Sequence, residues 1–153
     1  MAGCERAILF DADVIIKLHE WAYWSKVCKR LGPRACVGEY VAKNEARFYR
    51  DRTTHKSRPI RLDKLTADSV PRMVTVDDLS GEQYAQYLQH FSTLEVADAG
   101  ERETFALAWV LGYDVCSRDI AAREIFFTHR PEGCPSKHMD IMPLLRKLKI
   151  IDL

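Results

Sequence analysis

Short apolar runs alternate with longer stretches of helical periodicity, and this alternation limits the possible folds more than any other feature of the chain. The run 6–10 ends at Asp11, and apolar residues then recur every three or four positions from Ile15 to Leu31, just before Gly32. Strands that alternate with helices require right-handed crossovers and pair in parallel. We therefore expect an α/β fold in three α/β/α layers, with a mainly parallel central sheet.

The same alternation continues to the end of the chain. Apolar and β-branched runs predict further strands at 35–37, 73–76 and 115–117, and a short extended piece at 150–151. Helical patterns predict helices at 81–93, 99–111, 120–127 and 141–147, with a loop at 130–137. A less regular helix carries Glu39 and Glu45. Asp13 is best placed to cap the first helix, which we expect to begin near Val14.

Length and composition indicate one domain that spans residues 1–153. A chain of 153 residues that is 47% hydrophobic can bury one core and is short for two. The 23 basic and 22 acidic residues nearly cancel, which gives no general attraction to nucleic acid or membrane. No apolar stretch reaches the roughly 20 residues of a membrane helix, and the N-terminus lacks the order of a secretory signal. We expect a cytoplasmic protein without a membrane partner.

The cysteines indicate structural thiols. They are odd in number and have no CxxC spacing, which argues against a disulfide framework and against a zinc site. The five positions are Cys4, Cys28, Cys36, Cys116 and Cys134.

Acidic residues follow the predicted strands at the points where the strands end. Asp11 and Asp13 follow the first strand, and Asp119 follows the strand 115–117, while Glu101 and Glu103 open the helix 99–111. In an open parallel sheet the binding crevice lies beyond the carboxyl ends of the strands. Carboxylates crowded there repel one another and favour a bound cation, and magnesium prefers oxygen ligands. The pattern predicts a metal-dependent hydrolase of phosphodiesters.

Four segments together resemble the PIN domain, a family that includes the ribonuclease toxins of bacterial toxin–antitoxin pairs. The first segment is ILFDAD at 8–13, and the second holds Glu45, six residues after Glu39. The third is GERE at 100–103, which leads into ALA at 106–108, and the fourth is SRD at 117–119. These segments span most of the chain.

The resemblance implies an endoribonuclease whose acids surround one or two Mg²⁺ or Mn²⁺ ions. Its implied ligands are Asp11, Glu45, Glu103 and Asp119, with Glu101 and Asp13 as neighbours and Ser117 as a small hydroxyl residue beside them. Glu101 and Glu103 point roughly 200° apart on a helix, so either could be the third ligand. The resemblance also implies RNA as substrate, and it suggests an antitoxin protein and a homodimer as possible partners.

One concentrated basic stretch, 47–64, could hold the RNA. Its cations could bind the phosphate backbone in a salt-dependent manner, although such a stretch could equally be a solvated surface. Tyr49 and His55 lie within it and could stack on unpaired bases. The residues predicted to contact nucleic acid are Arg47, Arg50, Arg52, Lys56 and Arg58.

Two other functions remain open. The sequence 11–15 is also similar to the first motif of haloacid dehalogenase-like phosphatases, in which Asp11 would be a covalent nucleophile. Alternatively, the chain could be a catalytically inactive module of PIN fold that binds nucleic acid or protein. An aromatic stripe that includes Tyr84, Tyr87 and Phe91 would then be a candidate partner surface, although such stripes more often belong to a core. Each acid could also serve only as a helix cap or ion-pair partner.

Overall fold

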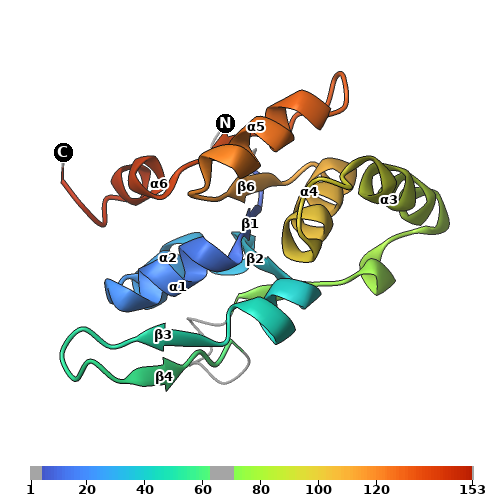
Figure 1. Cartoon of the computed structure of the whole chain (residues 1–153). Helices are drawn as coiled ribbons and strands as arrows, with labels where there is room; N and C mark the ends of the chain where they lie inside the picture. The colour runs from blue at the N-terminus through green and yellow to red at the C-terminus, as the bar shows by residue number, and fades with distance from the viewer. Residues whose placement is uncertain (1–4, 63–70, 153) are drawn as a thin grey trace.

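A computed structural model of the chain, which describes residues 5–62 and 71–152, contains a five-stranded sheet whose strands all pair in parallel. The strand order is β5-β2-β1-β6-β7 (Figure 1). The strands are β1 (Ile8–Phe10), β2 (Ala35–Gly38), β5 (Arg72–Val74), β6 (Asp114–Cys116) and β7 (His138–Met139). β1 lies at the centre because it pairs with β2 on one side and with β6 on the other.

Helices cover both faces of this sheet, which confirms the three-layer α/β/α arrangement. The longer helices are α1 (Ala12–Glu20), α2 (Trp24–Leu31), α3 (Gly81–Thr93), α4 (Ala99–Leu111), α5 (Ile120–His129) and α6 (Ile141–Lys147). Three shorter helical segments are η2 (Gly32–Arg34), η3 (Val41–Glu45) and η4 (Val76–Asp78). Figure 1 shows α1, α2 and α6 on one side of the sheet and α3 and α4 on the other.

Alternating side chains of the strands divide the core into two parts. Ile8 and Phe10 pack in the cluster that also contains residues of α1, α2 and α6, whereas Leu9 packs in the cluster formed with α3, α4 and α5. All three side chains of β1 are almost completely buried. This burial explains why the first strand reads as a continuous apolar run, since a parallel strand at the centre of a sheet has no face toward water.

The first helical segment differs from its prediction because it forms two helices. α1 ends at Glu20, and Ala22 has a positive φ of 61° before α2 begins at Trp24. α1 also begins at Ala12 rather than near Val14, and its cap is Asp11, whose carboxylate accepts the Ala12 N–H at 2.9 Å. The prediction of Asp13 as the cap is therefore wrong, because the helix starts directly after the strand.

The basic stretch contains an antiparallel hairpin that the sequence patterns do not predict. β3 (Phe48–Arg50) pairs with β4 (Ser57–Pro59), and the side chain of Tyr49 lies against His19 of α1 with 5.2 Å between the ring centroids. Lys64, the last cation of the stretch, lies outside the described residues. β7 was likewise not predicted, since two residues are too short to show a pattern. Within the described ranges, no helix has both the length and the apolar character needed to cross a bilayer.

The backbone at Ala22 provides a test of this helix break. Replacing Ala22 with glycine should raise the free energy of unfolding by about 0.5–1 kcal/mol, because glycine adopts a positive φ without the steric cost that alanine has there. Urea denaturation would measure the change. Ala85, an exposed residue in the interior of α3, is the matched control, and Ala85→Gly should lower stability by about 1 kcal/mol. Equal destabilisation by both substitutions would contradict the positive φ.

Candidate metal centre

Four of the described helices begin at the carboxyl edge of the sheet with an aspartate as N-cap; one of them is α6, which follows β7 and is capped by Asp140. Asp11 caps α1, Asp98 caps α4 by accepting the Glu101 N–H at 2.9 Å, and Asp119 caps α5 by accepting the Ala121 N–H at 2.8 Å. β1 and β6 end side by side, since the Asp11 N–H donates to the Cys116 carbonyl at 3.0 Å. Helix N-termini carry a partial positive charge, which favours carboxylates at these positions.

Glu45 reaches this edge from the end of η3 and lies against the backbone of α4. A Cβ atom at Gly100 would overlap the Glu45 carboxylate, so only glycine permits this approach. Burial raises the pKa of Glu45, and the charges of Asp98 and Glu103 raise it further. Glu45 therefore belongs to the same group of acids as Asp98, although 53 positions separate them in the sequence.

Asp11 and Glu101 show the strongest electrostatic effects of this crowding. Burial raises the pKa of Asp11 to about 7; the Ala12 N–H opposes this shift, and the charges of Asp98 and Glu45 add to it. The pKa of Glu101 rises to about 8 through burial, the charge of Asp98 and the charge of Asp11, with a smaller effect from Asp119. Each of these acids is thus within electrostatic range of several others. We call Asp11, Glu45, Asp98, Glu101 and Asp119 the acidic cluster.

Asp98 is the member of the acidic cluster that the sequence analysis missed. Its charge raises the pKa of Asp11, of Glu45 and of Glu101, which gives it as many partners in the cluster as Asp11 or Glu101 has. The signal was present in the sequence, because an Asp directly before a helix with Glu three residues later is typical of a capped N-terminus. This pattern alone indicates a helix cap and does not indicate which other acids the capping side chain faces.

The structure places Glu101 and Glu103 on different sides of α4. Glu101 faces Asp11, Asp98 and Asp119, whereas the Glu103 carboxylate accepts the Tyr40 N–H at 2.9 Å and lies beside Gly38. Burial raises the pKa of Glu103, and the bond from Tyr40 lowers it. Glu103 remains close enough to Glu45 to affect its pKa. It therefore joins α4 to the segment after β2 and flanks the acidic cluster.

Ser117 is directed toward β7. Its buried hydroxyl lies 2.5 Å from Nε2 of His138, and the side chain of His138 packs against the rings of Phe126 and Phe127. Burial, with a smaller effect from Arg123, lowers the pKa of His138 to about 4, so this imidazole is neutral at ordinary pH. Asp13 is exposed on α1 and influences Asp11 only through its charge.

The chemistry of the acidic cluster suits a hard divalent cation. All of its members offer carboxylate oxygens, the ligands that Mg²⁺ and Mn²⁺ prefer. Within the described ranges, no three His, Cys, Asp or Glu side chains already stand in an arrangement that would hold a metal ion. The raised pKa values and the close approach at Gly100 nevertheless show that these acids are held near one another at a free-energy cost that a cation would reduce.

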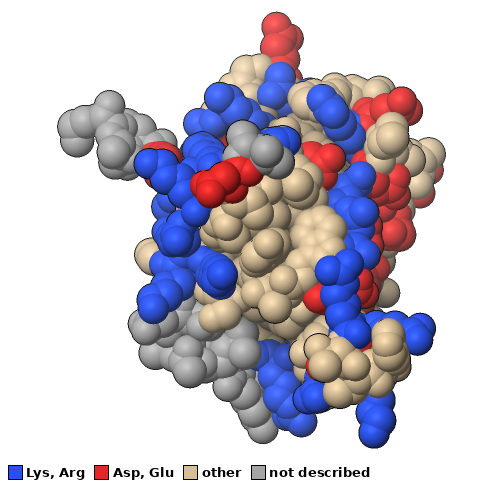
Figure 2. Space-filling view, turned by 90° about the vertical axis from the view of Figure 1, so that its left-hand side faces the viewer, with Lys and Arg blue, Asp and Glu red and all other residues tan. Residues whose placement is uncertain are grey.

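The hairpin carries the predicted cations on exposed positions. Arg47 lies over the Phe48 ring at 5.6 Å, and Arg58 pairs with Asp51 at 2.6 Å. A shallow hollow of about 360 Å³ is lined in part by Arg50 and Arg52. Figure 2 shows Lys and Arg side chains projecting from the lower end of the molecule, where Figure 1 places β3 and β4. The hairpin follows η3, which ends at Glu45, and packs against α1. Lys56 is exposed near its turn.

No protein-family model, curated protein or solved structure matches the chain. The resemblance to PIN domains therefore depends on the four sequence segments alone.

Gly100 provides a test of the geometry of the acidic cluster. In Gly100→Ala the new methyl group should displace the Glu45 carboxylate, because the end of that side chain is the part that can move. The pKa of Glu45, measured by NMR titration, should then fall toward its ordinary value as the side chain leaves Asp98 and becomes more hydrated. Gly81→Ala is the control, since a Cβ there meets nothing within 4 Å. An unchanged Glu45 titration in Gly100→Ala would contradict the proposed contact.

Proposed function

We propose that the protein is a metal-dependent endoribonuclease of the PIN type. The observation that carries this proposal is the acidic cluster, in which acids from four separate segments meet at the carboxyl edge of a parallel sheet. Open parallel sheets bind their ligands at this edge. The order of the acids along the chain also agrees with the four segments that resemble the family.

The acidic cluster would hold Mg²⁺ or Mn²⁺ through Asp11, Glu45, Glu101 and Asp119, with Asp98 between them. A cation so held lowers the pKa of a bound water and stabilises the negative charge that develops on a phosphodiester. Asp11 and Glu101, whose pKa values are about 7 and 8, retain protons near neutral pH when no cation is bound and would release them when the cation binds. Asp98 and the two neighbouring helix N-termini fix the positions of these carboxyl groups.

The hairpin would hold the RNA strand. Arg50, Arg52 and Lys56 are exposed and close in sequence, which suits contacts to successive phosphates. Tyr49 already packs against His19, so His55, which is exposed at the turn, is the better candidate for contact with a base. Arg58 is partly neutralised by Asp51 and would contribute less.

The two alternative functions predict different behaviour at the same residues. A phosphatase that uses Asp11 as nucleophile would form a phosphoaspartate there, whereas a nuclease would not. An inactive binding module would bind RNA or a protein without cutting RNA. An antitoxin partner and a homodimer are further proposals that follow from the resemblance and do not alter the roles of the acidic cluster.

Substitution of two distant acids tests the nuclease proposal. Asp11→Asn and Asp119→Asn should each reduce the cleavage of a single-stranded RNA with added Mn²⁺ by at least about 100-fold, because each removes a charge needed to hold the cation. Asp77→Asn, which removes an exposed acid on η4, is the control and should cut at the parent rate. Circular dichroism would establish that all three variants are folded. Unchanged cleavage by both cluster variants would exclude the acidic cluster as the active site.

A further inference from the structure

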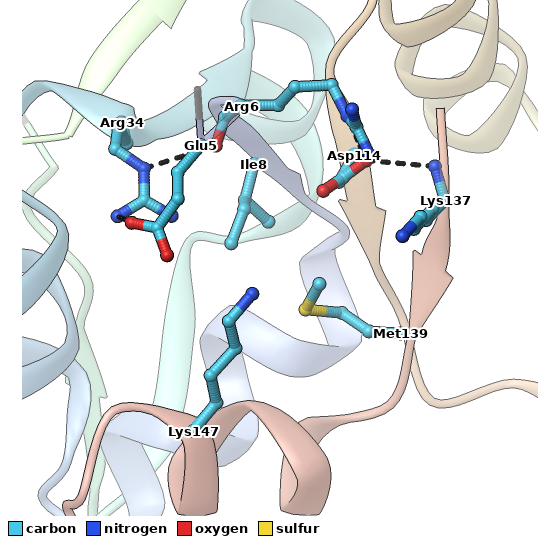
Figure 3. A pocket seen from close by; sticks show the side chains of 8 residues that line it. All are labelled: Glu5, Arg6, Ile8, Arg34, Asp114, Lys137, Met139 and Lys147. Carbon is cyan, nitrogen blue, oxygen red and sulfur yellow. Dashed lines mark hydrogen bonds and ion pairs between the residues drawn. The ribbon is translucent and has the colours of Figure 1, made fainter. Parts of the chain in front are cut away.

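A second, basic hollow lies at the opposite edge of the sheet from the acidic cluster. Its volume is about 290 Å³, and Ile8 and Asp114 contribute to its lining from the first positions of β1 and β6 (Figure 3). These two residues are paired in the sheet, whereas Asp11 follows the last residue of β1. Three residues of strand span roughly 10 Å, so the hollow and the acidic cluster are separated by about the length of the strands.

The charges around this hollow are mainly positive. Arg6, Arg34, Lys137 and Lys147 line it together with the acids Glu5 and Asp114, which leaves a net charge of 4 − 2 = +2. A neighbouring hollow shares Glu5, Arg34 and Lys147 with it and adds Arg30 and Lys149. In Figure 2, Lys and Arg side chains lie along both sides of the face, and most of the Asp and Glu side chains gather toward the right-hand edge.

Ion pairs hold the two arginines of the hollow in place and leave its lysines free. Arg6 Nε donates to Asp114 Oδ1 at 2.9 Å, and the same oxygen accepts the Lys137 backbone N–H at 2.9 Å. Arg34 donates from Nε to the Arg6 carbonyl at 3.2 Å and pairs through Nη1 with Glu5 at 3.0 Å. Within the described residues, the ammonium groups of Lys137 and Lys147 form no ion pair.

The shape and composition of the hollow favour a small ligand with one concentrated negative charge. Figure 3 shows Lys147 extending from α6 toward Glu5 and Ile8, with the Met139 side chain beside it. Ile8 and Met139 provide an apolar floor below the cations. A phosphomonoester carries a charge close to −2 at neutral pH, which matches the net charge of the lining, and arginine forks bind phosphate oxygens well.

We propose that this hollow is a binding site for a small phosphorylated molecule, with Arg6, Arg34, Lys137 and Lys147 around the phosphate and Ile8 and Met139 against its apolar part. The site is independent of the proposed nuclease activity, because it shares no residue with the acidic cluster. Its volume of about 290 Å³ suits a small molecule better than a polymer, which favours an extended groove.

Calorimetric titration with adenosine 5′-monophosphate, without divalent cations, tests this site. The nucleotide should bind once per chain, and Lys137→Gln combined with Lys147→Gln should weaken binding by at least about tenfold, because both residues are exposed cations in the lining of the hollow. Lys29→Gln is the control, because it removes an exposed charge of α2 outside both hollows. The affinity of this variant for the nucleotide should stay within about twofold of the parent value. Inorganic phosphate should also bind to the parent protein, and the double variant should lose the same factor of affinity for it. Adenosine should not bind.

Several results would overturn the proposal. The proposal is wrong if the parent protein does not bind the nucleotide. It is also wrong if Lys29→Gln loses as much affinity as the double variant, or if adenosine binds as tightly as its monophosphate. Binding of a single-stranded RNA through Lys137 and Lys147, without binding of the monophosphate, would assign the surface to nucleic acid instead. Unfolding curves of the double variant that match the parent would establish that any loss is local.

Discussion

The main physical constraint on this structure is the burial of several carboxyl groups close together at the carboxyl edge of the sheet. Parallel pairing of β1 with β6 brings Asp11 to the edge from which α5 begins, and α4 adds Asp98 and Glu101 between them. The pKa of Asp11 rises from 3.8 to about 7, which corresponds to on the order of 4 kcal/mol against its charged form. A helix N-terminus stabilises a carboxylate by only about 0.3–1 kcal/mol, so capping alone does not offset the free-energy cost of burying the charged group. The acids must hold protons or share a cation.

The sequence predicts the strands that end at this site better than it predicts which acids face one another there. The strand before Asp11 is a continuous apolar run, and Val115 and Cys116 indicate the strand before Asp119, so both strands can be located by inspection. The choice between Glu101 and Glu103 depends on how α4 rotates against the sheet, and that rotation is set by packing of buried residues such as Phe105. Asp98 has the pattern of an ordinary helix cap, and only the fold shows which acids it faces.

The elements that were not predicted share a physical cause. Ala22 interrupts the first helical segment in a left-handed conformation, although alanine gives no signal for such a break. The hairpin is exposed on both strands and contacts the body mainly through Tyr49, so it lacks the alternation of a half-buried strand. β7 has only two residues and follows Ser136, which is fixed by its hydroxyl bond to the Ala108 carbonyl at 3.0 Å. Tertiary contacts decide each of these cases.

Calorimetric titration of the protein with Mn²⁺ in buffers of different ionisation enthalpy tests the central claim most directly. Carboxyl groups whose pKa values are raised to about 7 and 8 still hold protons at pH 6.5, and a cation must displace them. At pH 6.5 the binding of one cation should release about one proton or more, and this release should disappear as the pH rises above 8. Failure to bind Mn²⁺, or binding without proton release at pH 6.5, would contradict a carboxylate cluster that a cation stabilises.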